Sequence, residues 1–136
     1  PFGSPIESPA GIQGKATQFV MILDALQLRL LEKIRSDLAG YSVVRSTSPL
    51  DNRAIWLEIF AGGIHKGNSC QTLLKKLNIN CKEVAGLGND YNDIDFLDIC
   101  AEAYLVANAP VNLQRHYKLV KSDKEEGFTE FISKVL

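Results

Sequence analysis

The segment EVAGLGNDYNDIDFLDICAEAYLVAN, residues 83–108, decides the fold of the C-terminal half of this chain. Two short apolar runs, EVAGLG (83–88) and AYLVAN (103–108), flank a helix-like stretch around IDFLDICAEA (94–103). Short apolar strands that alternate with helices are typical of parallel βαβ units. The segment therefore predicts an α/β fold built on a parallel sheet.

The same alternation continues on both sides of this segment. Apolar periodicity predicts a further strand at YKLVKS (117–122) and helices at NSCQTLLKKLNI (68–79), near VNLQRH (111–116) and over EEGFTEFISKVL (125–136). From residue 61 to residue 136 the chain is therefore expected to form one α/β unit with three strands.

The first part of the chain has a different pattern. The run QFVMILD (18–24) predicts a strand, and after it apolar residues recur at helical spacing at Leu26, Leu30, Ile34 and Leu38, with Gly40 ending the helix. Two further runs, YSVVRS (41–46) and AIWLEIF (54–60), are expected to pair as a hairpin across the turn residues TSPLDN. This pattern predicts a small α+β unit over residues 17–60. Residues 1–16 are interpreted as a linker or disordered segment.

Composition limits the classes of partner. The chain has 136 residues and a net charge of −1, which gives no electrostatic attraction to nucleic acid or to an anionic membrane. No apolar run approaches the roughly 18 residues of a membrane span. The three cysteines, Cys70, Cys81 and Cys100, have no CxxC spacing and predict neither a disulfide framework nor a zinc site. We expect a cytoplasmic protein with a small-molecule partner.

The turn GLGNDYND (86–93) is rich in oxygen donors. It follows a predicted strand, and ligands of parallel sheets gather at the carboxyl ends of the strands. Mg²⁺ takes one or two carboxylates together with phosphate and water, so this turn is a candidate metal site. The alternative is that Asp90 or Asp93 caps the following helix.

A second candidate lies at GGIHKGNS (62–69), which places Lys66 in a glycine-rich loop at the start of a helix. Backbone N–H groups and the helix dipole favour an anion at such a position, and a lysine adds a positive charge for a phosphoryl group. The order of residues does not match GxxxxGK[ST], which excludes a nucleotide-binding P-loop.

In this order, GGIHKGNSCQTLLKKLNI, EVAGLGNDYNDIDFLDICAEAYLVANAP and KSDKEEGFTEFI resemble the C-terminal half of a haloacid dehalogenase superfamily phosphatase of the Cof-like branch. The resemblance covers Trp56 to the end of the chain, with weaker similarity to the family's cap from Gln18. It implies the C-terminal part of a Rossmann-like core over residues 61–136 and a partial cap over residues 17–60.

The resemblance also implies residue roles. Lys66 takes the position of the lysine that stabilises the nucleophile and the phosphate, and GNDYND matches the Mg²⁺-binding GDxxxD motif at Gly88 and Asp93. Asn89 stands where the first acidic residue is usual, with Asp90 beside it, so Asn89, Asp90 and Asp93 are the candidate metal residues. The positions assigned to the phosphate and active-site loops are Gly67, Asn68, Gly88, Asn92 and Asn108.

The nucleophile of this family is missing from the chain. Family members attack phosphorus with the first aspartate of a DxDx[TV] motif, and the second acts as general acid and base. Asp24 has no second aspartate two residues on, and Asp93 and Asp95 lie where a helix begins and point to different sides. The chain also starts at Pro1 and not at a methionine, which is compatible with the loss of upstream sequence.

The resemblance therefore implies a Mg²⁺-dependent phosphomonoester hydrolase that acts on a small phosphorylated metabolite, such as a sugar phosphate, present here as a truncated and inactive chain. The alternative is a non-catalytic binding or scaffold module with a degenerate fold of this family. A three-stranded remainder of the sheet would expose an edge, which predicts a homodimer or association with the missing N-terminal part.

Four further residues have alternative interpretations. Glu58, in the strand before the lysine loop, is either a functional contact or an outward-facing strand residue. Arg45 either touches the leaving group of a substrate or is solvated. His65 and His116 lack metal-ligand spacing and are expected to be structural or exposed.

Overall fold

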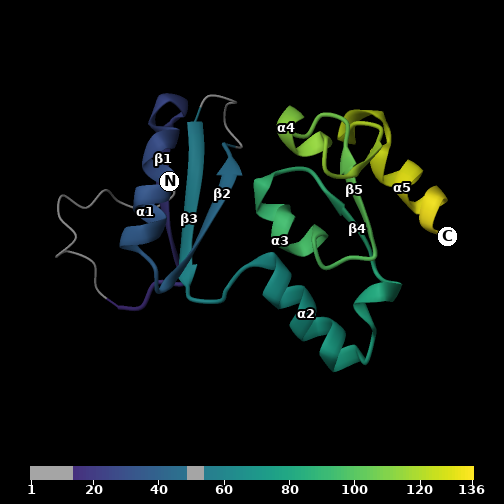
Figure 1. Ribbon diagram of the computed structural model, residues 1–136, viewed down its shortest axis with the longest axis horizontal. Coiled ribbons are helices and arrows are strands. Elements are labelled where there is room, and N and C mark those ends of the chain that lie inside the picture. Colours follow the sequence, from purple (N-terminus) through teal and green to yellow (C-terminus); the bar gives the residue numbers. More distant parts are fainter. Residues whose placement is uncertain (1–13, 49–53) are drawn as a thin grey trace.

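The computed structural model describes residues 14–48 and 54–136, and this part of the chain contains two three-stranded sheets that lie side by side (Figure 1). The sheet of the N-terminal lobe is antiparallel, and that of the C-terminal lobe is parallel. A short connection from Ala61 to Lys66 joins the two lobes. The predicted α/β fold with a Rossmann-like parallel sheet is confirmed.

The N-terminal lobe has the β-α-β-β order expected from its sequence. Its elements are β1 (Gln18–Asp24), the 3-10 helix η2 (Ala25–Leu30), α1 (Leu31–Asp37), β2 (Tyr41–Thr47) and β3 (Ala54–Ala61). The strand order is β1-β3-β2, and β3 pairs antiparallel with both neighbours. The predicted hairpin between the last two strands is confirmed, while most of its turn, TSPLDN, lies outside the described residues.

The prediction of one regular helix from Ala25 onward is wrong, because the first six residues form η2. The Asp24 side chain accepts the Leu26 N–H at 2.8 Å, and the Gln27 side chain accepts the Asp24 N–H at 3.0 Å. A 3-10 helix has 3.0 residues per turn, so apolar residues spaced for an α-helix do not stay on one face. Leu26 is accordingly 88% exposed, and burial begins at Leu31.

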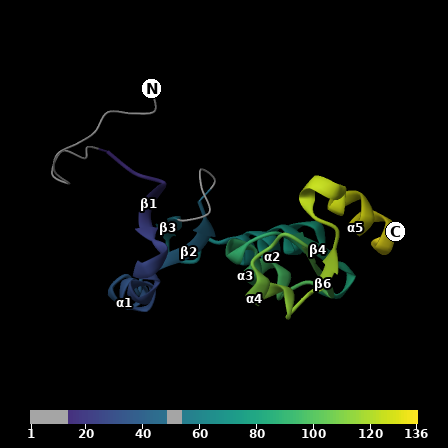
Figure 2. The ribbon, with the colours of Figure 1, turned by 90° about the horizontal axis from the view of Figure 1, so that it is seen from above.

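The two faces of the N-terminal sheet differ. Successive strand residues point to opposite faces, and on one face Leu23, Ile55 and Leu57 pack against Leu31 of α1. Figure 2 shows α1 on this side of the sheet. On the other face Ile22 is 61% exposed, and no described helix covers the strands. That uncovered face carries Glu58, because Glu58 lies one residue after Leu57 in β3.

The C-terminal lobe repeats strand and helix, as the sequence predicts. Its elements are α2 (Lys66–Leu77), η3 (Cys81–Glu83), β4 (Ala85–Gly88), η4 (Tyr91–Asp93), α3 (Ile94–Leu97), β5 (Glu102–Val106), α4 (Val111–Gln114), β6 (Lys118–Val120), η5 (Asp123–Glu125) and α5 (Gly127–Val135). The sheet order is β4-β5-β6, with both pairs parallel. Parallel pairing brings the carboxyl ends of the three strands to one edge of the sheet.

Both faces of the parallel sheet are covered. The neighbouring β5 residues Tyr104 and Leu105 point to opposite faces, and both are buried. Tyr104 meets Phe131 of α5 edge to face, with 5.4 Å between ring centroids, and Leu97 of α3 joins the same core cluster. Figure 2 shows α3 and α5 on opposite sides of the strands. This packing fixes the strand ends that carry the candidate site.

The helix predicted around residues 94–103 is much shorter than expected. Helix α3 ends at Leu97, and the chain then turns to reach β5. The N–H groups of Ala101 and Glu102 donate to the Val84 carbonyl at 2.9 and 3.3 Å, which pulls this segment into the sheet. The competition for backbone hydrogen bonds therefore favours the strand over a longer helix.

All three cysteines are free thiols, as their spacing predicts. Burial, followed by the proximity of Cys70 and Cys81, raises the pKa of the Cys100 thiol to about 11. Among the described residues, no helix is long and apolar enough to cross a membrane.

Candidate functional site

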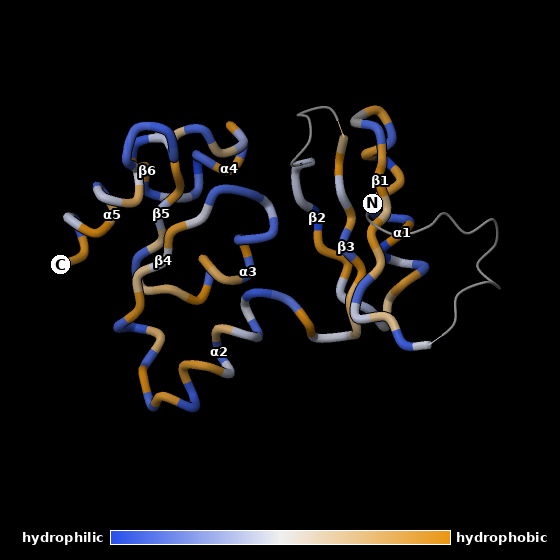
Figure 3. The backbone as a smooth tube through the Cα atoms, turned by 180° about the vertical axis from the view of Figure 1, so that it is seen from behind, coloured by the Kyte–Doolittle hydropathy of each residue, from blue (hydrophilic) through white to orange (hydrophobic). Residues whose placement is uncertain are grey.

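The loop between β4 and α3 carries the GNDYND residues and reaches toward β2, as the hydrophilic segment in Figure 3 shows. Gly88 ends β4 at a tight point of this loop. A Cβ atom built on Gly88 would lie 2.8 Å from the Cβ of Asp93, which is closer than side chains pack. Glycine at this position lets Asp93 fold back over the end of the strand.

Asp93 organises the site. Its side chain is 7% exposed, and its Oδ2 accepts the backbone N–H groups of Asn89 at 2.8 Å and Asp90 at 3.2 Å. Its Oδ1 accepts from Lys66 Nζ at 2.5 Å. The lysine loop and the acidic loop therefore meet, although they are 27 residues apart in the sequence. The buried carboxylate fixes both the loop backbone and the lysine.

Lys66 is held in place by hydrogen bonds but remains accessible to solvent. Besides Asp93, its Nζ donates to Asn92 Oδ1 at 3.3 Å, and its side chain remains 52% exposed. An ammonium group has three donors, so one is left for a ligand. Lys66 is also the first residue of α2, whose start has no side-chain cap, and the first N–H groups of a helix have no partner within it. The charge and these N–H groups would favour a bound anion at this position.

Asp90 faces the N-terminal lobe. Its carboxylate accepts the Thr47 backbone N–H at 2.5 Å and the Thr47 hydroxyl at 2.9 Å. It also accepts the Tyr91 N–H at 2.7 Å as the N-cap of η4, which confirms the capping alternative for this residue. Asp90 is thus a bridge between the two lobes, and both of its oxygens are in use.

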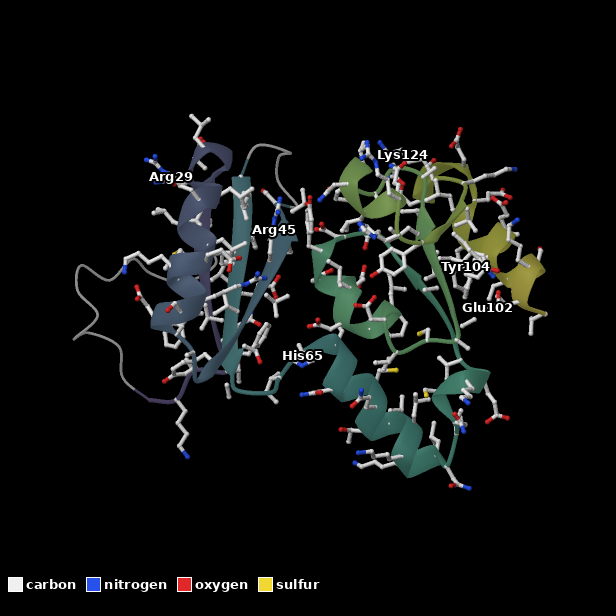
Figure 4. All side chains as sticks on the ribbon, viewed as in Figure 1. Arg29, Arg45, His65, Glu102, Tyr104 and Lys124 are labelled. Carbon is white, nitrogen blue, oxygen red and sulfur yellow. The ribbon has the colours of Figure 1, made fainter. Side chains whose placement is uncertain are left out.

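Arg45 lies on β2 toward the C-terminal lobe, as Figure 4 shows. Its guanidinium stacks over the Tyr91 ring at 3.6 Å from the centroid, and the Tyr91 hydroxyl donates to Asn112 Oδ1 at 2.7 Å. Arg45 is therefore half-buried against Tyr91 and not fully solvated, and its contact with the leaving group of a substrate stays a prediction. A cation over an aromatic face is attractive, so this pair adds a second tie between the lobes.

The three candidate metal residues are not equivalent. Both oxygens of Asp90 and of Asp93 accept hydrogen bonds, whereas Asn89 is exposed and its side chain has no partner among the described residues. Within that same part of the chain no group of three His, Cys, Asp or Glu side chains is arranged for a metal ion. Mg²⁺ needs few protein ligands when it also binds phosphate and water, and the Asn89 amide oxygen suits it. The residues present therefore fit a Mg²⁺ site to which this chain gives one ligand, Asn89, and in which other groups supply the remaining ligands.

The remaining predicted positions hold loops in place. The Asn68 side chain donates to the Gly63 carbonyl at 2.9 Å, which fixes the connection between the lobes. Asn108 exchanges hydrogen bonds with Asp123, at 2.8 Å from its Nδ2 and 3.2 Å to its Oδ1. Asn108 thus ties the loop after β5 to η5 and makes no contact with Lys66. The roles predicted for these residues stay predictions.

Of the two histidines, only His65 lies near the lysine. Its Nδ1 is 3.1 Å from Asp95 Oδ2, yet this buried atom makes no hydrogen bond with the part of the chain that the structure describes. Figure 4 shows His65 at the start of α2. His116 is exposed, as expected.

Gly67 has a packing role at this site. A Cβ at Gly67 would lie 2.5 Å from the Asp95 carbonyl oxygen, so α2 can approach α3 only with glycine there. We expect Gly67→Ala to lower the free energy of unfolding by about 1–3 kcal/mol, since overpacking forces the two elements apart. Urea unfolding followed by circular dichroism measures this change.

Gly40→Ala is the matched control, because a Cβ at Gly40 meets no atom within 4 Å. Its free energy of unfolding should change by less than about 0.5 kcal/mol. Equal stability of the two variants would contradict the close approach at Gly67.

Two contributors to the site were missed by sequence reasoning. The sequence pattern predicts Thr47 as a turn residue and Ser46 as the last residue of a strand, and it assigns neither a role. Thr47 holds Asp90, and the Ser46 hydroxyl donates to Glu58 Oε1 at 3.0 Å. For Ser46 the strand register offers a signal, because Ser46 and Glu58 fall on the same face of the predicted hairpin. No sequence pattern indicates the role of Thr47, because its partner, Asp90, belongs to the other lobe.

The chain is similar in sequence to a family of known proteins. A family model described as haloacid dehalogenase-like hydrolase matches residues 9–132. A protein named "Putative phosphatase" from Streptococcus pyogenes serotype M6 is 27% identical over 95 residues, which cover 69% of this chain and 33% of that protein. This chain thus spans about a third of that relative's length.

Solved structures have a similar fold. The protein SMU.1108c from Streptococcus mutans UA159 superposes with a TM-score of 0.79 at 23% identity, over 95% of this chain and 48% of that one. The HAD subclass IIB sugar phosphatase BT4131 superposes with a TM-score of 0.69 at 14% identity, over 86% of this chain and 42% of that one. At these identities the likeness concerns the fold alone.

Proposed function

Because the chain belongs to the haloacid dehalogenase-like hydrolases, we propose that it forms the lysine and metal-loop part of a Mg²⁺-dependent phosphomonoester hydrolase. The observation that carries the proposal is the position of Lys66. Its ammonium lies at the uncapped start of α2 and is held by the buried carboxylate of Asp93. A fixed cation beside free backbone N–H groups suits a phosphate ester.

In this proposal each residue of the chain has one task. Lys66 binds a phosphate oxygen and offsets the negative charge that repels an attacking carboxylate. Asp93 keeps Lys66 in place and shapes the loop from Asn89 to Asn92, and Asn89 offers its amide oxygen to Mg²⁺. When bound, Mg²⁺ supplies Lewis-acid polarisation of the phosphoryl group and orients it.

The attacking aspartate would come from a segment that this chain does not contain. The sequence has no DxDx[TV] motif, and the chain spans less than half of the similar solved structures. We propose that the nucleophile lies elsewhere in a longer hydrolase and that this chain alone is inactive. The partial cap over residues 17–60 and the core over residues 61–136 are parts of this proposal.

The partners proposed are a small phosphorylated metabolite in the cytoplasm and a second protein surface. Four consecutive residues of the edge strand β1, Phe19 to Ile22, are between 38% and 61% exposed. An apolar edge strand favours pairing. We propose that the missing N-terminal part or a second copy of the chain covers it.

The test is a phosphatase assay on the complete reading frame that contains this chain, with sugar phosphates and other phosphomonoesters as substrates. We expect release of inorganic phosphate with MgCl₂, loss of release in EDTA, and recovery when Mg²⁺ is restored. The 136-residue chain alone should release none.

Three outcomes would contradict the proposal. Turnover by the chain alone would contradict a nucleophile outside it, and equal turnover in EDTA would contradict the need for metal. A complete reading frame without DxDx[TV] would instead favour a binding or scaffold module.

A further inference from the structure

A cavity of about 230 Å³ opens beside Lys66 between the two lobes. Its lining includes Val44, Glu58 and Phe60 of the N-terminal sheet, and also Lys66 and Asn92 of the C-terminal lobe. Small-molecule pockets have about 300–1,000 Å³, so the part of the cavity that this chain encloses suits a small ligand. A phosphate held at Lys66 would leave the rest of its molecule facing the sheet.

Strand register directs Glu58 into this cavity. Glu58 is directly opposite Val44 in the β2–β3 pair, and Phe60 is opposite Ser42, so these side chains share one face of the sheet. The other face is closed by α1, where Leu57 is fully buried. Glu58 therefore lies on the uncovered face, which the sheet turns toward the lysine.

The Glu58 carboxylate is only partly used. Its Oε1 accepts the Ser46 hydroxyl at 3.0 Å, and Oε2 has no partner among the residues that the structure describes. Lys66 pairs with Asp93, and no ion pair joins it to Glu58 among the described residues. The cavity is thus lined by both a cation and a carboxylate with one free oxygen. A ligand complementary to it has a phosphate at one end and a hydroxyl or ammonium donor at the other.

We infer that Glu58, oriented by Ser46, is a specificity-determining residue that accepts a hydrogen bond from the leaving group of the substrate. Its charge selects phosphate esters of neutral or amine-bearing alcohols and rejects leaving groups that carry a carboxylate or a second phosphate. A negatively charged leaving group is repelled by the half-buried Glu58 carboxylate. A leaving group without a hydrogen-bond donor leaves the carboxylate oxygen unpaired, so such a substrate binds less well. This inference rests on the proposed phosphatase function.

The test compares two substrates with the complete hydrolase: a hexose 6-phosphate, whose leaving group is a neutral sugar alcohol, and 3-phosphoglycerate, whose leaving group is an alcohol that carries a carboxylate. We expect the ratio of their kcat/KM values to favour the hexose phosphate in the unaltered enzyme. In Glu58→Gln this ratio should fall at least about tenfold, because the like charge is removed while the shape is kept. The ratio is independent of how much of a variant is folded.

Glu32→Gln is the matched control, since Glu32 lies in α1 with its side chain 82% exposed, and it should leave the ratio unchanged. Activity on both substrates with the same ratio in Glu58→Gln as in the unaltered enzyme would overturn the inference alone. A wild-type preference for 3-phosphoglycerate would also overturn it. Absence of hydrolysis of any phosphomonoester would overturn the proposed function, and this inference with it.

Discussion

Replacing Lys66 with methionine should lower kcat/KM for phosphomonoesters by about 100- to 1,000-fold in the complete hydrolase, the effect of removing one preorganised donor from a developing charge. Methionine keeps the length of the side chain but has no charge and no N–H donor. The loss has two causes, because the phosphate loses its cation and Asp93 keeps an uncompensated negative charge near the ester. Steady-state phosphate release measures the change.

Lys76→Met is the control for this substitution, since Lys76 lies in the last turn of the same helix, far along α2 from the loop. It should leave kcat/KM within about a factor of two, as expected for a surface substitution. A loss below tenfold in Lys66→Met would show that the ammonium group is not part of the phosphate site.

Replacing Asp93 with alanine should destabilise the chain itself. The Asp93 carboxylate accepts the N–H groups of Asn89 and Asp90 and the ammonium of Lys66, and it is almost fully buried. Two backbone donors would lose their partner, and we expect the free energy of unfolding to fall by about 3 kcal/mol. Urea unfolding of the 136-residue chain measures this without any need for catalysis.

Asp95→Ala is the matched control on the same segment. The Asp95 side chain is 59% exposed and forms an ion pair, within the described residues, with His65 alone, so its removal should cost less than about 1 kcal/mol. If both alanine variants unfold at the same urea concentration, the loop does not depend on the Asp93 carboxylate.

The strands and the meeting of the two loops could be predicted from the sequence. The strands are short apolar runs ended by glycine or polar residues, and this pattern is local. The contact of Lys66 with Asp93 follows from topology, because a loop after a parallel strand and the start of the preceding helix share one end of the sheet. The structure brings Asp93, which the sequence predicts as a metal residue, into contact with Lys66, although the sequence could not show that both oxygens of Asp93 would be taken by hydrogen bonds.

Contacts between the lobes could not be predicted. Thr47 and Asp90 are 43 residues apart and belong to different sheets, so neither apolar periodicity nor turn chemistry connects them. The length of α3 also escaped prediction, since Val84 draws the following residues into the sheet through backbone hydrogen bonds. In both cases a tertiary contact decides what the local pattern leaves open.

The bridge formed by Asp90 has a thermodynamic consequence. One carboxylate both caps the turn that carries Asp93 and accepts two hydrogen bonds from Thr47 at the edge of the N-terminal sheet. Separating the two lobes would break the hydrogen bonds between Asp90 and Thr47 and would therefore also weaken the turn that carries Asp93. The separation of the lobes and the affinity for an anion at Lys66 are thus thermodynamically linked. If contact between the lobes increases the affinity for a ligand, the bound ligand stabilises that contact by the same coupling free energy.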